Sequence, residues 1–97
     1  MTESGAIQTA RVVHNRSAQQ FELHVGNMLC LLQYRINNEK MIVYHTEVPP
    51  PVQNRGIAER MTRTALEYAR AERLKIEPRF PYTAAFRRRH REYSDLL

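Results

Sequence analysis

The sequence predicts an α+β fold in which one main helix packs on a mainly antiparallel sheet, in the order β-β-β-α-β-α. Residues 20–25 and 32–36 alternate between apolar and polar side chains, whereas residues 54–73 carry apolar side chains at helical spacing. Three consecutive prolines, residues 49–51, separate the two patterns. A chain of 97 residues has room for one domain, so we expect residues 1–97 to form it, with residues 1–9 as a loose end.

Three strands are expected before the prolines, after a short edge strand opened by Val12 and Val13. Residues 20–25 have apolar side chains at odd positions, and the following Gly26-Asn27 is a hairpin signal. Residues 28–36 form the next strand, with Ile36 among its inward side chains, and Asn37-Asn38 forms the next turn. Residues 40–48 are apolar on both faces near their centre, which predicts a central strand.

The main helix is expected from Asn54 to Arg73. Its apolar stripe contains Ile57, Met61, Ala65, Tyr68 and Ala69, and the opposite face carries charges that include an i,i+4 pair of Glu59 and Arg63. Residues 74–77 form a short strand that ends at Pro78. A second helical stretch is expected from Pro81 to about His90, because proline is favoured in the first turn of a helix.

Composition excludes several classes of protein. A single cysteine, Cys30, cannot form an internal disulfide or a cysteine-based zinc site, and we expect it to be a buried structural thiol. His14 and His24 are too scattered for a metal site, so no metal is expected. No apolar run approaches the roughly 20 residues of a membrane span, and the N-terminus lacks a secretory signal. We therefore expect a cytoplasmic protein with no membrane partner.

Positive charge is concentrated in the second half of the chain. Residues 1–50 hold four basic and four acidic side chains, whereas residues 51–97 hold eleven basic and six acidic ones, which accounts for the net charge of +5. This asymmetry favours an anionic partner, which composition alone leaves open among a nucleic acid, an acidic surface and a phosphorylated small molecule.

The junction between the third strand and the helix is a candidate anion site. It reads Val52-Gln53-Asn54-Arg55-Gly56-Ile57-Ala58. Backbone N–H groups at a helix start lack internal partners and attract anions, and glycine lets a phosphate approach closely. Arg55, Arg60 and Arg63 could add positive charge. The alternative interpretation is a turn glycine that only precedes a helix.

Two further segments accompany this junction in a known family. Gln53-x-x-Gly56-x-Ala58 resembles the pyrophosphate-binding loop of GNAT-type N-acetyltransferases. His45-Thr46-Glu47-Val48-Pro49 and the final Arg89-His90-x-Glu92-Tyr93-x-Asp95-Leu96-Leu97 resemble a subfamily of very short GNAT-like proteins. The resemblance covers about residues 19–97.

The resemblance implies a GNAT-like fold that binds acetyl-CoA or CoA. It assigns the pantetheine arm to the backbone of a strand that splays from its neighbour, at Glu47 and Val48. It assigns the pyrophosphate to Gln53, Asn54, Arg55, Gly56, Ile57 and Ala58. Transfer of acetyl to an amine needs a base and an acid, and the candidates are Glu47 as base, His45 as second choice and Tyr82 as acid. The acceptor is an amine of unknown identity, and a protein amine is compatible with the short N-terminal segment.

Some positions depart from the subfamily pattern. Phe80 stands where short relatives carry a cysteine. Phe86 stands where the pattern has an aromatic residue that carries a hydroxyl, and Arg91 stands where it has a proline. Phe80 can act neither as a nucleophile nor as an acid or base. The sequence therefore supports cofactor binding more firmly than catalysis.

The arginine run at residues 87–91 supports a rival interpretation. Four arginines in five residues can face solvent, neutralise the 3′-phosphate of CoA, or contact nucleic acid. One alternative function is thus a basic module that contacts nucleic acid or the ribosome, and another is a GNAT relic without catalysis. Each candidate acid or base also has a plainer interpretation: Glu47 as a solvated strand-end carboxylate, His45 as a core histidine and Tyr82 as a packing residue.

Overall fold

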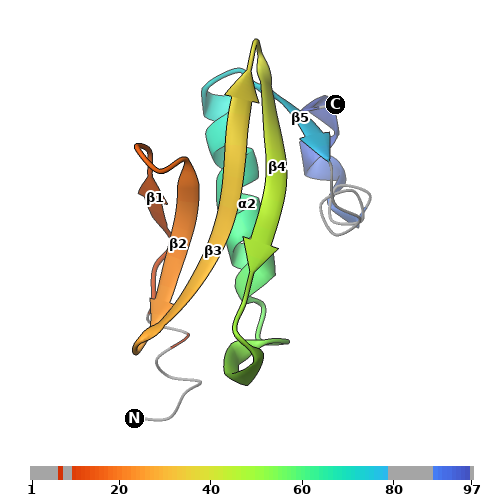
Figure 1. Ribbon diagram of the computed structural model, residues 1–97. Coiled ribbons are helices and arrows are strands. Elements are labelled where there is room, and N and C mark those ends of the chain that lie inside the picture. The colour runs from red at the N-terminus through yellow and green to blue at the C-terminus, as the bar shows by residue number, and fades with distance from the viewer. Residues whose placement is uncertain (1–6, 8–9, 79–88, 97) are drawn as a thin grey trace.

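The computed structural model describes residues 7, 10–78 and 89–96. The five strands form one sheet in the order β1-β2-β3-β4-β5, and all neighbours are antiparallel except β4 and β5, which are parallel (Figure 1). The predicted α+β architecture with a mainly antiparallel sheet is therefore confirmed. The elements are β1 (Val13–Asn15), β2 (Gln20–Val25), β3 (Met28–Asn37), β4 (Lys40–Glu47), the 3₁₀ turn η1 (Pro50–Val52), α2 (Ile57–Ala71), β5 (Lys75–Pro78) and the 3₁₀ helix η2 (Arg91–Leu96).

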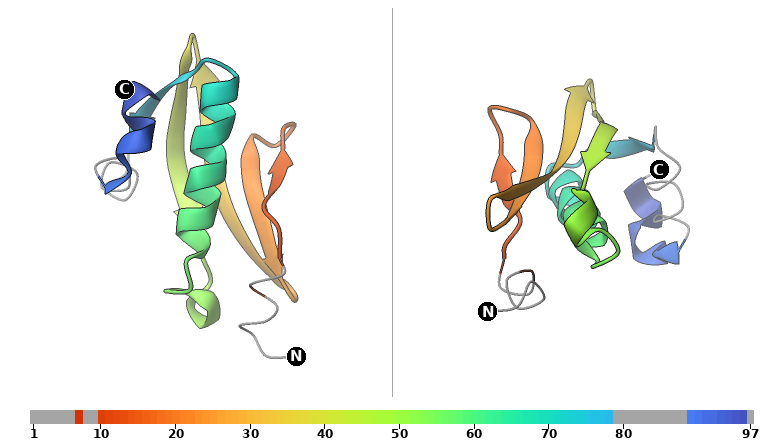
Figure 2. Two further views of the ribbon diagram at one scale, coloured as in Figure 1. Left: turned by 180° about the vertical axis from the view of Figure 1, so that it is seen from behind. Right: turned by 60° about the horizontal axis from the view of Figure 1, so that its bottom comes forward.

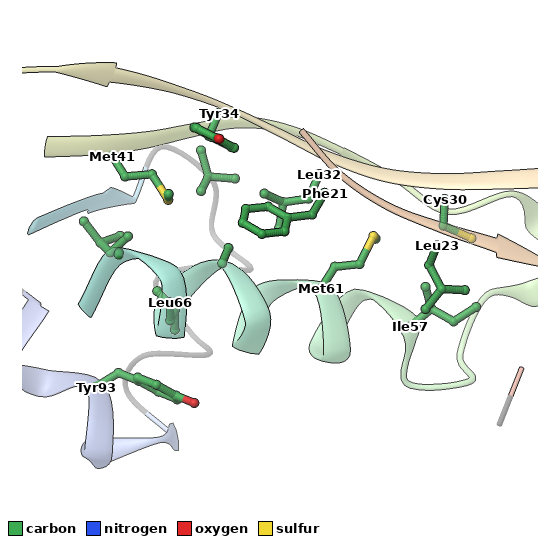
Figure 3. Packing of buried hydrophobic residues seen from close by; sticks show 14 of the residues in the cluster. Phe21, Leu23, Cys30, Leu32, Tyr34, Met41, Ile57, Met61, Leu66 and Tyr93 are labelled. Atoms are coloured by element: carbon green, nitrogen blue, oxygen red, sulfur yellow. The ribbon is translucent and has the colours of Figure 1, made fainter. Parts of the chain in front are cut away.

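The hydrophobic core lies between one face of the sheet and α2 (Figure 3). The predicted helical stripe is confirmed, since its members are buried apart from Tyr68, which is half-buried. The odd positions of β2 are buried as expected from their alternation. The sheet contributes Phe21, Leu23, Val25, Cys30, Leu32, Tyr34, Met41, Val43 and Ile76, and α2 contributes Ile57, Met61, Ala65, Leu66 and Ala69.

Both α2 and η2 lie on the same side of the sheet (Figure 2). No element of the described residues covers the opposite face, which we call the open face. Within those same residues, no helix is long and apolar enough to cross a membrane.

Several predicted boundaries were wrong, and backbone geometry explains most of them. The helix begins at Ile57 rather than Asn54, because Asn54 and Gly56 adopt left-handed φ values of 61° and 79°. It ends at Ala71, and Arg73 is again left-handed with φ of 59°. The second turn is Asn38-Glu39, and Asn38 supplies the positive φ that was expected of asparagine.

Other expectations differ in smaller ways. Ile36 is 39% exposed rather than buried, because it lies one residue before the end of β3. β4 ends at Glu47, and β5 spans residues 75–78 rather than 74–77. Ile7 is buried, although we expected it in a loose end. The helix predicted for residues 81–90 falls mostly outside the described residues.

Candidate functional site

A β-bulge in β4 sets which side chains face the site. Gln33 pairs with His45 and the next residue of β3, Tyr34, pairs with Val43, so Tyr44 is an extra residue on β4. Before the bulge the odd positions Met41 and Val43 are buried. After it the alternation is reversed, because Thr46 pairs with the buried Leu32 and lies on the helix side of the sheet.

The reversed alternation sends His45 and Glu47 to the open face. Their side chains are 46% and 60% exposed, and His45 Nε2 lies 3.9 Å from Glu47 Oε1. Without the bulge, both side chains would point into the core beneath α2. The sequence showed this only as a change of the apolar positions from odd, at Met41 and Val43, to even, at Val48.

The parallel ladder between β4 and β5 stops before β4 does. Its last pair is Val43 with Pro78, and β4 continues to Glu47. Proline has no N–H group to extend a ladder. In the described part of the chain, residues 44–47 of β4 therefore have no strand partner on their β5 side. Such an edge presents backbone donors and acceptors to an extended ligand.

The first turn of α2 opens toward the same end of β4. Gly56 is the N-cap in a left-handed conformation, and the first helical hydrogen bond runs from Arg60 N to Gly56 O at 3.1 Å. No side chain of the described residues caps this end. The N–H groups of the first turn thus carry partial positive charge without an internal partner. A Cβ at Gly56 would meet nothing within 4 Å, so the space above the glycine is open.

These features surround an open cleft of about 520 Å³. Of the residues assigned to cofactor binding by resemblance, Glu47 and Arg55 are not in its lining. The end of β4 and the loop before α2 form most of the cleft, and Arg89 of the C-terminal segment completes it. Its lining residues are Thr46, Val48, Val52, Gln53, Asn54, Gly56, Ile57, Ala58, Glu59 and Arg89.

Gln53 fixes the shape of the loop. Its Nε2 donates a hydrogen bond of 2.9 Å to the carbonyl of Val48, which joins the start of the loop to the residue after β4. Val52 beside it is fully buried and anchors η1 in the core. The loop therefore approaches the helix start from a defined direction.

Of the three arginines expected to add charge, Arg55 lies in the loop itself, whereas Arg60 and Arg63 are engaged elsewhere. Arg60 donates hydrogen bonds to the carbonyl oxygens of Ile7, at 2.7 Å, and Ala10. Arg63 pairs with Glu59 at 3.4 Å and Glu92 at 3.5 Å. Both guanidinium groups are thus used for internal contacts. Arg60 and Arg63 lie one and two turns past the N-cap Gly56. At these positions their side chains reach neighbouring segments rather than the loop, although their closeness in sequence had suggested that they would add charge to it.

Arg89 is the positive side chain that lines the cleft and was absent from the predicted site. Two sequence signals pointed to it: the C-terminal segment of the family resemblance, which begins at Arg89, and the arginine run at residues 87–91, for which one interpretation was contact with a CoA phosphate. Glu59, also in the lining, is engaged by Arg63 and by His90, whose Nε2 lies 3.7 Å from Glu59 Oε1.

The remaining residues that the sequence analysis considered for chemistry are either buried or lie outside the described part of the chain. Tyr82, Phe80 and Phe86 lie outside the described residues. Cys30 is fully buried as expected, and burial raises the pKa of its thiol above the usual range. A thiol in this state is a packing residue rather than a nucleophile.

Comparisons with known proteins relate the chain to one family and the fold to a solved structure. The family model for GCN5-related N-acetyl-transferases matches residues 20–96. Protein NATD1 from Xenopus tropicalis is 31% identical over 68 residues, which are 67% of this chain and 62% of that protein. The solution structure of a GCN5-like protein from Staphylococcus aureus aligns with a TM-score of 0.66 at 19% identity, covering 89% of this chain and 85% of the other. The chain belongs to the GCN5-related N-acetyltransferase family.

Proposed function

We propose that the protein binds acetyl-CoA in the cleft at the start of α2 and transfers the acetyl group to an amine. The observation that carries this proposal is the juxtaposition of two backbone features that have no partner among the described residues. One is the first turn of α2 behind Gly56, and the other is the edge of β4 beyond Val43. Family membership agrees with the same reaction.

The residues present fit the cofactor. The helix start offers N–H donors and the positive end of the dipole to a pyrophosphate, and the open space above Gly56 admits it. Thr46 and Val48 border the path from this point along β4, where the backbone edge suits the amides of a pantetheine arm. The volume of the cleft lies within the roughly 300–1,000 Å³ of small-molecule sites.

Acetyl transfer requires movement of two protons. When bound, acetyl-CoA supplies an activated acetyl group, which forms an amide with the amine as the carbon–sulfur bond breaks and the leaving thiolate is protonated. Glu47 is the proposed base that removes the proton of the attacking amine, and His45 is the alternative. Both lie beside the end of β4 on the open face, from which an acceptor as large as a protein could approach. Tyr82 remains the proposed acid for the thiolate.

Calorimetric titration of the wild-type chain with CoA and acetyl-CoA tests the proposal. We expect about one site per chain. Gly56→Glu should abolish binding, because the side chain and its charge would occupy the phosphate site. Gly26→Glu is the matched control, since Gly26 is also left-handed at φ of 60° with open space around its Cβ position, in the β2–β3 turn. Both substitutions should lose similar stability, about 1–2 kcal/mol, from the left-handed backbone.

Two results would contradict the proposal. One is the absence of heat and of a thermal shift with millimolar ligand for the wild type. The other is equal affinity of the folded Gly56→Glu and Gly26→Glu variants. A basic nucleic-acid module would instead bind oligonucleotides with an affinity that falls steeply with salt.

A further inference from the structure

The C-terminal segment at residues 89–96, which we call the tail, is fastened along α2. Tyr93 Oη donates a hydrogen bond of 2.7 Å to Glu67 Oε1, and Arg70 Nη2 lies 2.7 Å from Asp95 Oδ1. Tyr93 and Leu96 are 1% and 3% exposed, so the tail also contributes to the core. Figure 3 shows Tyr93 on the side of α2 away from the sheet. The tail is therefore an integral part of the fold.

The beginning of the tail is fastened beside the first turn of α2. His90 Nε2 lies 3.7 Å from Glu59 Oε1, and His90 Nδ1 lies 3.4 Å from Glu92 Oε1. Arg63 bridges the carboxylates of Glu59 and Glu92. Because His90 is held against this turn, the residue before it must lie next to the helix start.

Arg89 accordingly forms part of the cleft wall. It is exposed, and it makes no hydrogen bond or ion pair with the residues that the structure describes. The carboxylate of Glu59, which also lines the cleft and would repel an anion, is paired with Arg63 and His90. The tail thus adds to the cleft a guanidinium that has no partner among the described residues, beside a carboxylate that Arg63 of α2 already pairs.

We propose that Arg89 binds a phosphate group of CoA, and this inference rests on the proposed function. Guanidinium groups bind phosphate through two parallel N–H···O bonds, which single ammonium groups cannot do. The backbone N–H groups of the first turn hold one side of the phosphate-bearing end of the ligand, and Arg89 holds the other. The tail segment that carried part of the family resemblance then has a physical role, which is to fix an arginine at the cleft.

Titration with two ligands and three variants tests this role. CoA and 3′-dephospho-CoA differ only in the 3′-phosphate. Arg89→Gln should weaken CoA binding about tenfold or more, as expected for loss of a charge-assisted hydrogen bond. Arg89→Lys should recover part of the loss. Arg91→Gln is the matched control, because Arg91 is exposed in the same tail but does not line the cleft.

The two ligands also identify the phosphate. A loss confined to CoA would assign Arg89 to the 3′-phosphate, and an equal loss for both ligands would assign it to the pyrophosphate. If both ligands bind wild type, Arg89→Gln and Arg91→Gln with one affinity, the role of Arg89 is overturned while the proposed function stands. If wild type binds neither ligand, both are overturned. Thermal unfolding of each variant without ligand verifies that the tail stays folded.

Discussion

The hydroxyl of Tyr93 donates a 2.7 Å hydrogen bond to the carboxylate of Glu67, and this bond joins the C-terminal tail to the middle of α2. Burial and the neighbouring carboxylate raise the pKa of Tyr93, so the hydroxyl keeps its proton and remains a donor at neutral pH. The ring is almost fully buried. One side chain thus combines packing and a polar contact at the point where the tail meets the helix.

Tyr93→Phe should remove that hydrogen bond while keeping the ring. We expect a loss of about 1 kcal/mol in the free energy of unfolding, which is typical of one hydrogen bond. CoA affinity should fall less than in Arg89→Gln, because the tail loses one contact but keeps its arginine. Urea unfolding and calorimetry measure the two effects. Tyr44→Phe is the control, since Tyr44 is 37% exposed and lies away from the tail. Equal stability of the two variants would show that the Tyr93–Glu67 bond contributes nothing.

His14 should make stability depend on pH. Its ring stacks on Phe21 with centroids 4.2 Å apart, and its Nε2 lies 2.5 Å from the hydroxyl of Tyr34. Burial, and then the charge of Arg16, lower the pKa of His14 below its ordinary value of 6.5. The folded state therefore binds the proton less readily than the unfolded state does. The contribution of His14 to the free energy of unfolding is fully present above the pKa that His14 has in the unfolded state. This contribution is lost as the pH falls through 6.5 toward the lower pKa of the folded state.

Urea unfolding between pH 8 and 5 tests this dependence. His14→Gln should flatten the decline of the unfolding free energy below about pH 6.5 that wild type shows. His24→Gln is the control, because the side chain of His24 is 59% exposed. Equal slopes for wild type and His14→Gln would contradict the prediction.

Glu47→Gln should separate catalysis from cofactor binding. The carboxylate lies on the open face and is not part of the cleft lining, so the affinity for CoA should not change. If Glu47 is the base, kcat should fall about 10²- to 10⁴-fold. Glu39→Gln, in the exposed β3–β4 turn, is the matched control for loss of one negative charge. If Glu47→Gln and Glu39→Gln have the same kcat, Glu47 is not the base. The variant His45→Gln then tests whether His45 is the base.

Local patterns were sufficient for most of the fold. The odd positions of β2 and the spacing of Ile57, Met61, Ala65 and Ala69 predicted which faces are buried, because period two and period 3.6 each place one set of side chains together. Asn38 and Gly26 predicted turns because both accept positive φ. The helix start was misplaced by three residues, although Asn54 and Gly56 are residue types that accept the positive φ they adopt before the helix.

The sequence by itself determined the five strands, the main helix, their core faces and the glycine loop before the helix, because these depend on neighbours two to four residues apart. Only the tertiary structure decided the two features that give the site its chemistry. The bulge at Tyr44 depends on pairing with β3, and it directs His45 and Glu47 to the open face. The position of Arg89 depends on contacts between the tail and a helix some 30 residues earlier, such as that of His90 with Glu59. Such contacts depend on packing between segments far apart in the sequence, so the local spacing of apolar residues does not predict them.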